Sequence, residues 1–102
     1  MKKSFEENYI ESIEKGLNNS ICRIDSQITN QEIFFSNLVK LLNLINKKNG
    51  NLYFFGNGAS ASFSNHMALD WSKNGGILSF SLSDSSMLTA LSNDYSYKDS
   101  FL

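Results

Sequence analysis

The segment at residues 56–60, Gly-Asn-Gly-Ala-Ser, is the first place in the sequence where residue types and spacing point to chemistry. Glycines let the backbone turn tightly and approach a ligand closely. A helix that starts directly afterwards presents free N–H groups and the positive end of its dipole to an anion such as phosphate. Asn57 and Ser60 add polar side chains. The segment is not a dinucleotide fingerprint, which needs a third glycine at Ala61, nor a P-loop. A plain strand-to-helix turn capped by Ser60 is the alternative interpretation.

A polar stripe follows this segment, because Ser62, His66 and Asp70 are spaced four apart and share one face of the predicted helix. A histidine and a carboxylate at this spacing can share a divalent metal ion, or the carboxylate can act as a base beside the histidine. A solvated hydrogen-bonded pair is the simpler interpretation. A serine-hydrolase triad is disfavoured, since three turns of one helix do not produce its geometry. Two ligands alone also leave a zinc site incomplete.

A third candidate is the pair Asn93 and Asp94, followed by Tyr95 and Tyr97. Taken alone, Asn-Asp predicts a turn, because both side chains hydrogen-bond to nearby backbone.

Two helices are predicted ahead of these candidates. The first, over residues 4–27, has one apolar stripe made by Phe5, Tyr9, Ile13, Leu17, Ile21 and Ile24. Such a stripe must be buried, and we expect a partner subunit to cover it. The second helix is predicted to begin with a capping box from Thr29 to Glu32. It is expected to end at Asn49 and Gly50, after two lysines in its last turn.

The rest of the chain alternates between strands and helices. Residues 52–55 are an unbroken apolar run that predicts a strand covered on both faces, as in parallel sheets. A helix over residues 60–73 should turn Phe63, Met67 and Trp71 inward. Residues 77–82 predict a second strand, and a short helix should start within residues 83–86 and reach Leu91. This order indicates an α/β domain with a parallel sheet. Two strands are too few for such a sheet, so we expect a fragment or a sheet completed by other material.

Composition excludes several classes of function. The formal net charge of −1 provides no electrostatic footprint for nucleic acid. The single cysteine, Cys22, excludes an intramolecular disulfide and a cysteine-based zinc site. Four glutamates within residues 6–14 interrupt any signal-peptide core, and no apolar run approaches the ~20 residues of a membrane span. We therefore expect a cytoplasmic protein with no membrane partner.

Taken together, the candidate motifs resemble the phosphoheptose isomerase branch of the sugar isomerase (SIS) domain family. The resemblance runs from about Leu52 to Phe101. It rests on four pieces in the expected order, namely residues 55–61 (Phe-Gly-Asn-Gly-Ala-Ser-Ala), His66 with Asp70, residues 82–84 (Leu-Ser-Asp), and residues 89–95 (Thr-Ala-Leu-Ser-Asn-Asp-Tyr). It implies the N-terminal portion of a three-layer parallel-sheet α/β domain, residues 51–102, preceded by a helical pair, residues 1–50, that serves oligomerisation. It also implies a homotetramer with active sites at subunit interfaces.

The activity implied is aldose–ketose isomerisation of sedoheptulose 7-phosphate to a heptose 7-phosphate, which feeds surface polysaccharides such as lipopolysaccharide. By resemblance, the substrate loop falls on Asn57, Gly58, Ala59 and Ser60, and a second substrate motif falls on Asn93 and Asp94. His66 matches a zinc ligand. Asp70 matches a glutamate that is both zinc ligand and catalytic acid/base. Isomerisation through an enediol needs such a group, and zinc can stabilise the developing oxyanion.

The sequence departs from the family's pattern in three places. Asp70 is one methylene shorter than the family's glutamate, and a misplacement of about 1 Å can cost ~100-fold in rate. Ala59 replaces a glycine of the loop. The family's main phosphate loop and its later glutamine and histidine lie beyond Leu102, so we expect the C-terminal half of the domain to be absent. The alternatives are a non-catalytic SIS module that binds a sugar phosphate or a protein partner, and an inactive truncated chain without a ligand.

Overall fold

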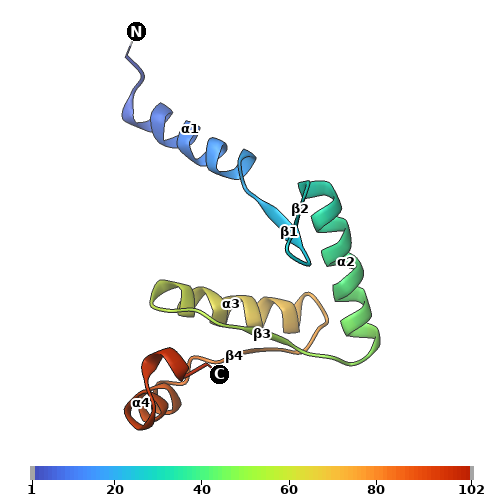
Figure 1. Cartoon of the computed structure of the whole chain (residues 1–102), viewed down its shortest axis with the longest axis vertical. Coiled ribbons are helices and arrows are strands. Elements are labelled where there is room, and N and C mark those ends of the chain that lie inside the picture. Colours follow the sequence, from blue (N-terminus) through green and yellow to red (C-terminus); the bar gives the residue numbers. More distant parts are fainter. Residues whose placement is uncertain (1, 102) are drawn as a thin grey trace. The chain divides into compact units, whose positions relative to one another are not determined.

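A computed structural model describes residues 2–101 of the chain (Figure 1). The contacts divide the chain into two compact units, Met1–Leu41 and Leu42–Leu102, which we call unit 1 and unit 2. Unit 1 holds a helix, a hairpin and the first part of a second helix, and unit 2 holds a parallel strand pair with the helices around it. Within the described residues, no helix combines the length and the apolar character that crossing a membrane requires.

The first helix, α1, spans Phe5–Asn18 and begins with a complete capping box. The Ser4 hydroxyl accepts a hydrogen bond from the Glu7 N–H at 3.2 Å, and the Glu7 carboxylate accepts one from the Ser4 N–H at 2.8 Å. Each contact satisfies an N–H group that has no acceptor within the helix. An exposed ion pair between Lys3 and Glu11, at 2.7 Å, adds a second local contact. Local hydrogen bonds and charges therefore define where α1 starts.

The prediction of one helix over residues 4–27 is wrong beyond Asn18. The chain instead forms a hairpin of β1 (Cys22–Ile24) and β2 (Gln27–Thr29), paired antiparallel with Cys22 opposite Thr29. The two linking residues, Asp25 and Ser26, have φ of 49° and 66°. Positive φ at both central positions is the pattern of the type I′ hairpin turn, and aspartate enters this region more easily than most residues. This turn, not the apolar spacing, decides the local structure.

The second helix, α2, spans Gln31–Lys47 and is capped by Asn30, whose Oδ1 accepts from the Ile33 N–H at 2.8 Å. The predicted cap at Thr29 is wrong, because Thr29 pairs within the hairpin. The predicted end is confirmed. Asn49 takes a positive φ of 52°, and the Gly50 N–H donates to the Ile45 carbonyl at 2.8 Å.

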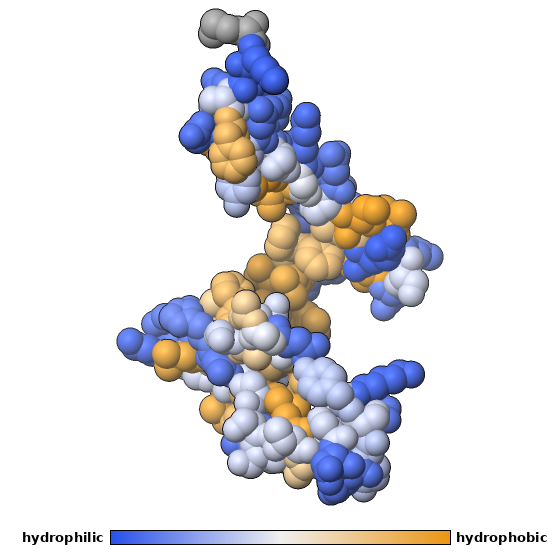
Figure 2. Space-filling view, turned by 90° about the vertical axis from the view of Figure 1, so that its left-hand side faces the viewer, coloured by the Kyte–Doolittle hydropathy of each residue, from blue (hydrophilic) through white to orange (hydrophobic). Residues whose placement is uncertain are grey.

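Most large apolar side chains of the two N-terminal helices are exposed. Along Phe5–Asn18 and Gln31–Lys47, which are fully described, no residue is buried. Apolar side chains are visible as orange surface in Figure 2. The large exposed apolar residues of these two helices are Phe5, Tyr9, Ile10, Ile13, Leu17, Ile33, Phe35, Leu38, Val39, Leu41 and Leu44. The amphipathic pattern predicted from the sequence is therefore present without a covering surface.

Unit 2 is built on two parallel strands, β3 (Leu52–Phe54) and β4 (Ser79–Ser81). Leu52 lies opposite Ser79, and Phe54 lies opposite Ser81. Helix α3 (Ala59–Lys73) connects the strands and lies alongside both (Figure 1). The predicted strand–helix–strand order and the parallel pairing are confirmed, so the mixed α/β class holds for this unit.

The face of α3 that meets the strands consists of small residues. Ser64 and Ala68 are buried, and one turn further the Ser72 hydroxyl accepts from the Ser79 N–H at 2.9 Å. Small side chains four apart let the helix approach the sheet closely, and they leave no space for an aromatic ring. The predicted inward position of Phe63 is therefore wrong, because its side chain is 65% exposed. Met67 and Trp71 are half-buried.

The opposite face of the strand pair is open in the described residues, contrary to the expectation of a strand covered on both faces. Tyr53 and Phe80 lie opposite each other on this face and are 54% and 40% exposed. Their rings stack with centroids 5.5 Å apart. Successive side chains of a strand point to opposite faces. The register therefore assigns the half-buried Leu52 and Phe54, and the buried Ser79, to the α3 side.

After β4 the chain forms helix α4 (Ser85–Asp94) and a single 3-10 turn, η1 (Tyr97–Asp99). Asp84 is the N-cap of α4, and its carboxylate accepts from the Met87 N–H at 2.9 Å. This confirms the helix start predicted within residues 83–86.

Candidate functional site

The segment at residues 56–60 links the carboxyl end of β3 to α3. A Cβ at Gly56 would lie 2.3 Å from the Ser60 carbonyl oxygen and 2.7 Å from the Ala61 nitrogen, so only glycine fits without moving the backbone. Gly58 is the N-cap of α3 with φ of 57° and ψ of −124°, a conformation that L side chains rarely adopt. Both glycines are thus required by the backbone, for two different reasons.

Ser60 is the second residue of α3, so the alternative in which it caps the helix is wrong. No described side chain caps α3 at Gly58, and the first turn of any helix leaves N–H groups without acceptors in the helix. The Ser60 N–H itself donates to the Asn57 carbonyl oxygen at 3.1 Å. Ala59 and Ser60 are exposed. The Ala61 N–H donates to the Gly58 carbonyl oxygen at 3.0 Å, so the N–H groups of Gly58 and Ala59 are the ones with which the segment can receive an anion or another oxygen-rich group.

Asn57 is connected to a distant part of the chain. The Tyr97 hydroxyl donates a hydrogen bond of 2.6 Å to the Asn57 Oδ1. Sequence reasoning named Tyr97 only as a neighbour of Asn93 and Asp94. The sequence did not predict this contact.

Asn93 and Asp94 are the last two residues of α4, so the turn predicted for them is wrong. The Asn93 Nδ2 donates to the Asp94 Oδ1 at 3.3 Å, and both side chains are exposed. The chain leaves the helix one residue later, at Tyr95, whose N–H still bonds the Leu91 carbonyl at 2.9 Å.

His66 and Asp70 are brought together as their spacing predicted. The His66 Nε2 lies 3.3 Å from the Asp70 Oδ2, and the side chains are 67% and 39% exposed. Ser62, one turn earlier on the predicted stripe, is exposed. The histidine and carboxylate can share a proton or supply two donors to a metal ion. Within residues 2–101, no group of three or more His, Cys, Asp or Glu side chains gathers around a common point. Two of the four donors of a tetrahedral zinc site are thus present in this part of the chain.

A polar cluster that sequence reasoning missed lies at the carboxyl end of β4. The Asn65 Oδ1 accepts from the Ser81 hydroxyl at 2.5 Å and from the Ser83 hydroxyl at 2.6 Å. Serines at every second position of residues 79–83 were the available signal, because this period places them on one side of an extended chain. Together with the segment at residues 56–60, the cluster places polar groups at the carboxyl ends of both parallel strands, the usual position of ligand sites in α/β sheets.

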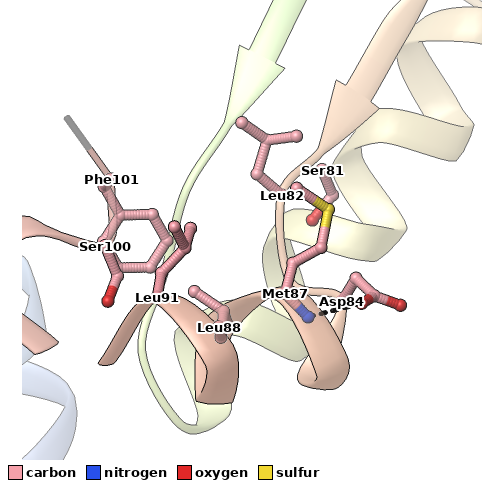
Figure 3. A pocket seen from close by; sticks show the side chains of 8 residues that line it. All are labelled: Ser81, Leu82, Asp84, Met87, Leu88, Leu91, Ser100 and Phe101. Atoms are coloured by element: carbon pink, nitrogen blue, oxygen red, sulfur yellow. Dashed lines mark hydrogen bonds between the residues drawn. The ribbon is translucent and has the colours of Figure 1, made fainter. Parts of the chain in front are cut away.

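A cavity of about 110 Å³ lies between β4, α4 and the C-terminal residues (Figure 3). Its lining is mainly apolar and consists of Leu82, Met87, Leu88, Leu91 and Phe101 together with Ser81, Asp84 and Ser100. The Asp84 carboxylate points to the Met87 N–H, as the cap of α4 (Figure 3). An apolar cavity of this size does not suit a charged sugar phosphate, so we place the candidate site at the glycine segment.

Comparison with known protein families, curated proteins and solved structures finds no match for the chain.

Proposed function

We propose that the chain supplies the substrate loop of a sugar-phosphate isomerase of the phosphoheptose type, a SIS-family enzyme of the cytoplasm. The observation that carries the proposal is the glycine segment that links β3, a strand of the parallel pair, to α3. Gly56 admits no side chain there, and Gly58 opens the start of the helix at a positive φ. The resemblance of residues 52–101 to that family selects the substrate class. The substrate proposed is sedoheptulose 7-phosphate, with Asn57, Gly58, Ala59 and Ser60 against it.

The reaction transfers a proton between adjacent carbons of the sugar. A base removes a proton from C1 of the ketose and the C2 oxygen gains a proton, which forms the enediol. A proton is then returned to C2 while the C1 hydroxyl loses its proton, which leaves the aldehyde at C1. Asp70 is the proposed acid/base. His66, at 3.3 Å, orients its carboxylate or exchanges a proton with it. Asn93 and Asp94, at the end of α4, are proposed as further substrate contacts.

Zinc is proposed as the cofactor, held in part by His66 and Asp70, and it would polarise the sugar carbonyl when bound. The partly exposed pair fits that role only together with further donors. The shorter side chain of Asp70, compared with the family's glutamate, is the feature least favourable to catalysis.

The test is isomerase activity of the full-length protein with zinc and sedoheptulose 7-phosphate, followed by NMR of the product. We expect Asp70→Asn to abolish turnover. Asp70→Glu, which restores the family's longer acid, should raise the rate by up to ~100-fold. Activity that is unchanged by both substitutions would exclude the proposed role of Asp70.

A second candidate is a SIS module that binds a sugar phosphate without turnover. Asp70 in the position of the family's glutamate favours it, since a short carboxylate would leave binding intact and impair proton transfer. Binding of sedoheptulose 7-phosphate detected by thermal shift, with no product even for Asp70→Glu, would select this candidate.

We propose a second copy of this chain as the partner that covers the N-terminal helices, in a homo-oligomer such as the tetramer that the resemblance implies. Charge supports this choice, because α1 carries four glutamates and one lysine, whereas α2 carries one glutamate and two lysines. In an antiparallel pairing, Glu6 and Glu7 at the start of α1 would lie near Lys47 at the end of α2 of the other copy. Complementary charge of this kind sets orientation and partner choice.

A further inference from the structure

We propose that Tyr97 is a positioning residue that fixes the orientation of the Asn57 carboxamide, so that Asn57 presents its N–H groups to a ligand oxygen. The inference rests on the proposed function for the identity of the ligand, a sugar phosphate. It adds a residue that the resemblance did not assign and a chemical role for the contact it makes.

The hydrogen bond between the two side chains decides which atoms of Asn57 face the ligand. A carboxamide has one oxygen that accepts and one nitrogen that carries two donors. The Tyr97 hydroxyl donates to the Asn57 Oδ1 at 2.6 Å, so the oxygen is already engaged within the protein. The Nδ2 group remains, and it selects acceptor atoms such as the hydroxyl, carbonyl or phosphate oxygens of a sugar phosphate. The backbone carbonyl of Asn57 is also engaged, by the Ser60 N–H.

Tyr97 is itself held in place from two sides. It is the first residue of η1, which is capped by Ser96, whose hydroxyl accepts from the Asp99 N–H. Its ring meets that of Phe101 edge-on with centroids 6.3 Å apart, and Phe101 meets Phe55 edge-on at 5.7 Å. Phe55 directly precedes the glycine segment. The aromatic series therefore ties η1 to the end of β3.

The base of η1 is secured by one buried polar residue. The Ser100 hydroxyl donates to the Ser96 carbonyl at 3.1 Å and lies 3.0 Å from the Ser92 hydroxyl at the end of α4. Ser100 is only 8% exposed. Tyr97, by contrast, is 53% exposed, so its hydroxyl contributes little through burial. The main effect of that hydroxyl is on the atom it touches, the Asn57 Oδ1.

The test compares Tyr97→Phe with the matched control Tyr95→Phe in the full-length protein. Both changes remove one hydroxyl, and Tyr95 is 76% exposed. We expect the Kd for sedoheptulose 7-phosphate, measured by calorimetry, to rise about 5- to 10-fold for Tyr97→Phe, the effect of one net hydrogen bond, and to stay unchanged for Tyr95→Phe. Equal Kd values for wild type and Tyr97→Phe would overturn the proposal.

A double-mutant cycle separates positioning from general support. In an Asn57→Ala background, Tyr97→Phe should change the Kd by less than about 2-fold, because its effect passes through the missing carboxamide. The same 5- to 10-fold loss in that background would assign Tyr97 a merely structural role and overturn the proposal.

A measurement without ligand keeps the inference separate from the proposed function. The side-chain amide protons of Asn57 should have the same NMR shifts in wild type and in Tyr95→Phe. They should have different shifts in Tyr97→Phe. If wild type does not bind sedoheptulose 7-phosphate, the proposed function fails and this readout still decides the role of Tyr97. Identical Asn57 shifts in all three proteins would contradict it.

Discussion

Unit 1 and unit 2 have similar shares of helix but are stabilised in different ways. In unit 1, α1 depends on contacts between near neighbours in sequence, such as the Ser4–Glu7 capping box and the Lys3–Glu11 pair. In unit 2, strands far apart in sequence pair with each other, and α3 packs on them through Ser64 and Ala68. The glycine segment therefore lies in the part of the chain whose backbone is constrained by tertiary contacts, whereas the apolar faces of α1 and α2 are exposed in the described residues.

The largest expected difference in stability is between alanine substitutions at Gly56 and at Gly16. Gly56→Ala should lower the free energy of unfolding of unit 2 by about 3 kcal/mol, since a Cβ would collide with the backbone of Ser60 and Ala61. Gly16→Ala should stabilise α1 by roughly 0.5–1 kcal/mol, because no described atom lies within 4 Å of the added carbon and alanine favours the helix.

Trp71 provides the measurement for this contrast, since it is the single tryptophan of the chain and lies in unit 2. Urea unfolding followed by Trp71 fluorescence should shift for Gly56→Ala and stay unchanged for Gly16→Ala. Amide exchange in α1 reports the Gly16 variant. Equal stability of Gly56→Ala and wild type would mean that the loop geometry described above is incorrect.

The open face of α1 provides the next largest effect. Ile13→Asp places a charge on the apolar stripe, at a side chain that is 47% exposed in the single chain. We expect the proposed oligomer to dissociate, with at least a tenfold weaker association constant by light scattering, because a buried unpaired charge opposes assembly. Ser12→Ala, at an uncharged exposed position of α1, is the neighbouring control and should leave assembly nearly unchanged. A wild-type protein that is monomeric at high concentration would exclude the second copy as partner.

Removal of one N-cap in each unit compares a supported helix with an unsupported one. Asp84→Ala should lower the stability of unit 2 by about 1 kcal/mol, measured with Trp71 fluorescence, because the Met87 N–H loses its acceptor. Ser4→Ala should speed amide exchange in the first turn of α1 and leave the Trp71 transition where it is. A shift of that transition by Ser4→Ala would show that the two units unfold together.

The smallest expected effect is a pH dependence confined to α1. The hydrogen bond from Lys3, and then the charges of Lys15 and Lys3, lower the pKa of the Glu11 carboxyl from its ordinary 4.5. A carboxyl whose pKa is lowered in the folded state stabilises that state above the ordinary pKa, and the contribution is lost as pH falls through the lowered pKa. The protection factors of the α1 amides should therefore fall as the pH drops from about 4.5 through the lowered pKa, and Glu11→Gln should weaken this dependence.

The sequence was sufficient to predict unit 2 in outline. An apolar run, a glycine turn and a helix pattern of ordinary length identified β3, α3 and β4, because each signal is local and the three agree. The prediction of which side of α3 faces inward was wrong. It chose the most apolar side chains, and Phe63 is exposed. Close packing of a helix on two strands selected Ser64 and Ala68 by size, which hydrophobic periodicity alone does not report.

Other features could not be derived from local patterns. The hairpin at Cys22–Thr29 depends on two residues with positive φ, and aspartate followed by serine is a weak signal for that turn. The contact between Tyr97 and Asn57 joins residues 40 positions apart, and only the folded chain brings them together. Spacing of four on one helix predicted the His66–Asp70 pair correctly, because helix geometry alone determines it.

We propose that the glycine segment of unit 2 binds a sugar phosphate. Titration of the ¹⁵N-labelled full-length protein with sedoheptulose 7-phosphate, followed by amide NMR, tests it most directly. Binding at this segment should produce saturable shifts concentrated at residues 57–60 and at Asn93 and Asp94, with α1 unaffected. Shifts that are absent at millimolar ligand, or that fall on α1 and α2 instead, would contradict it.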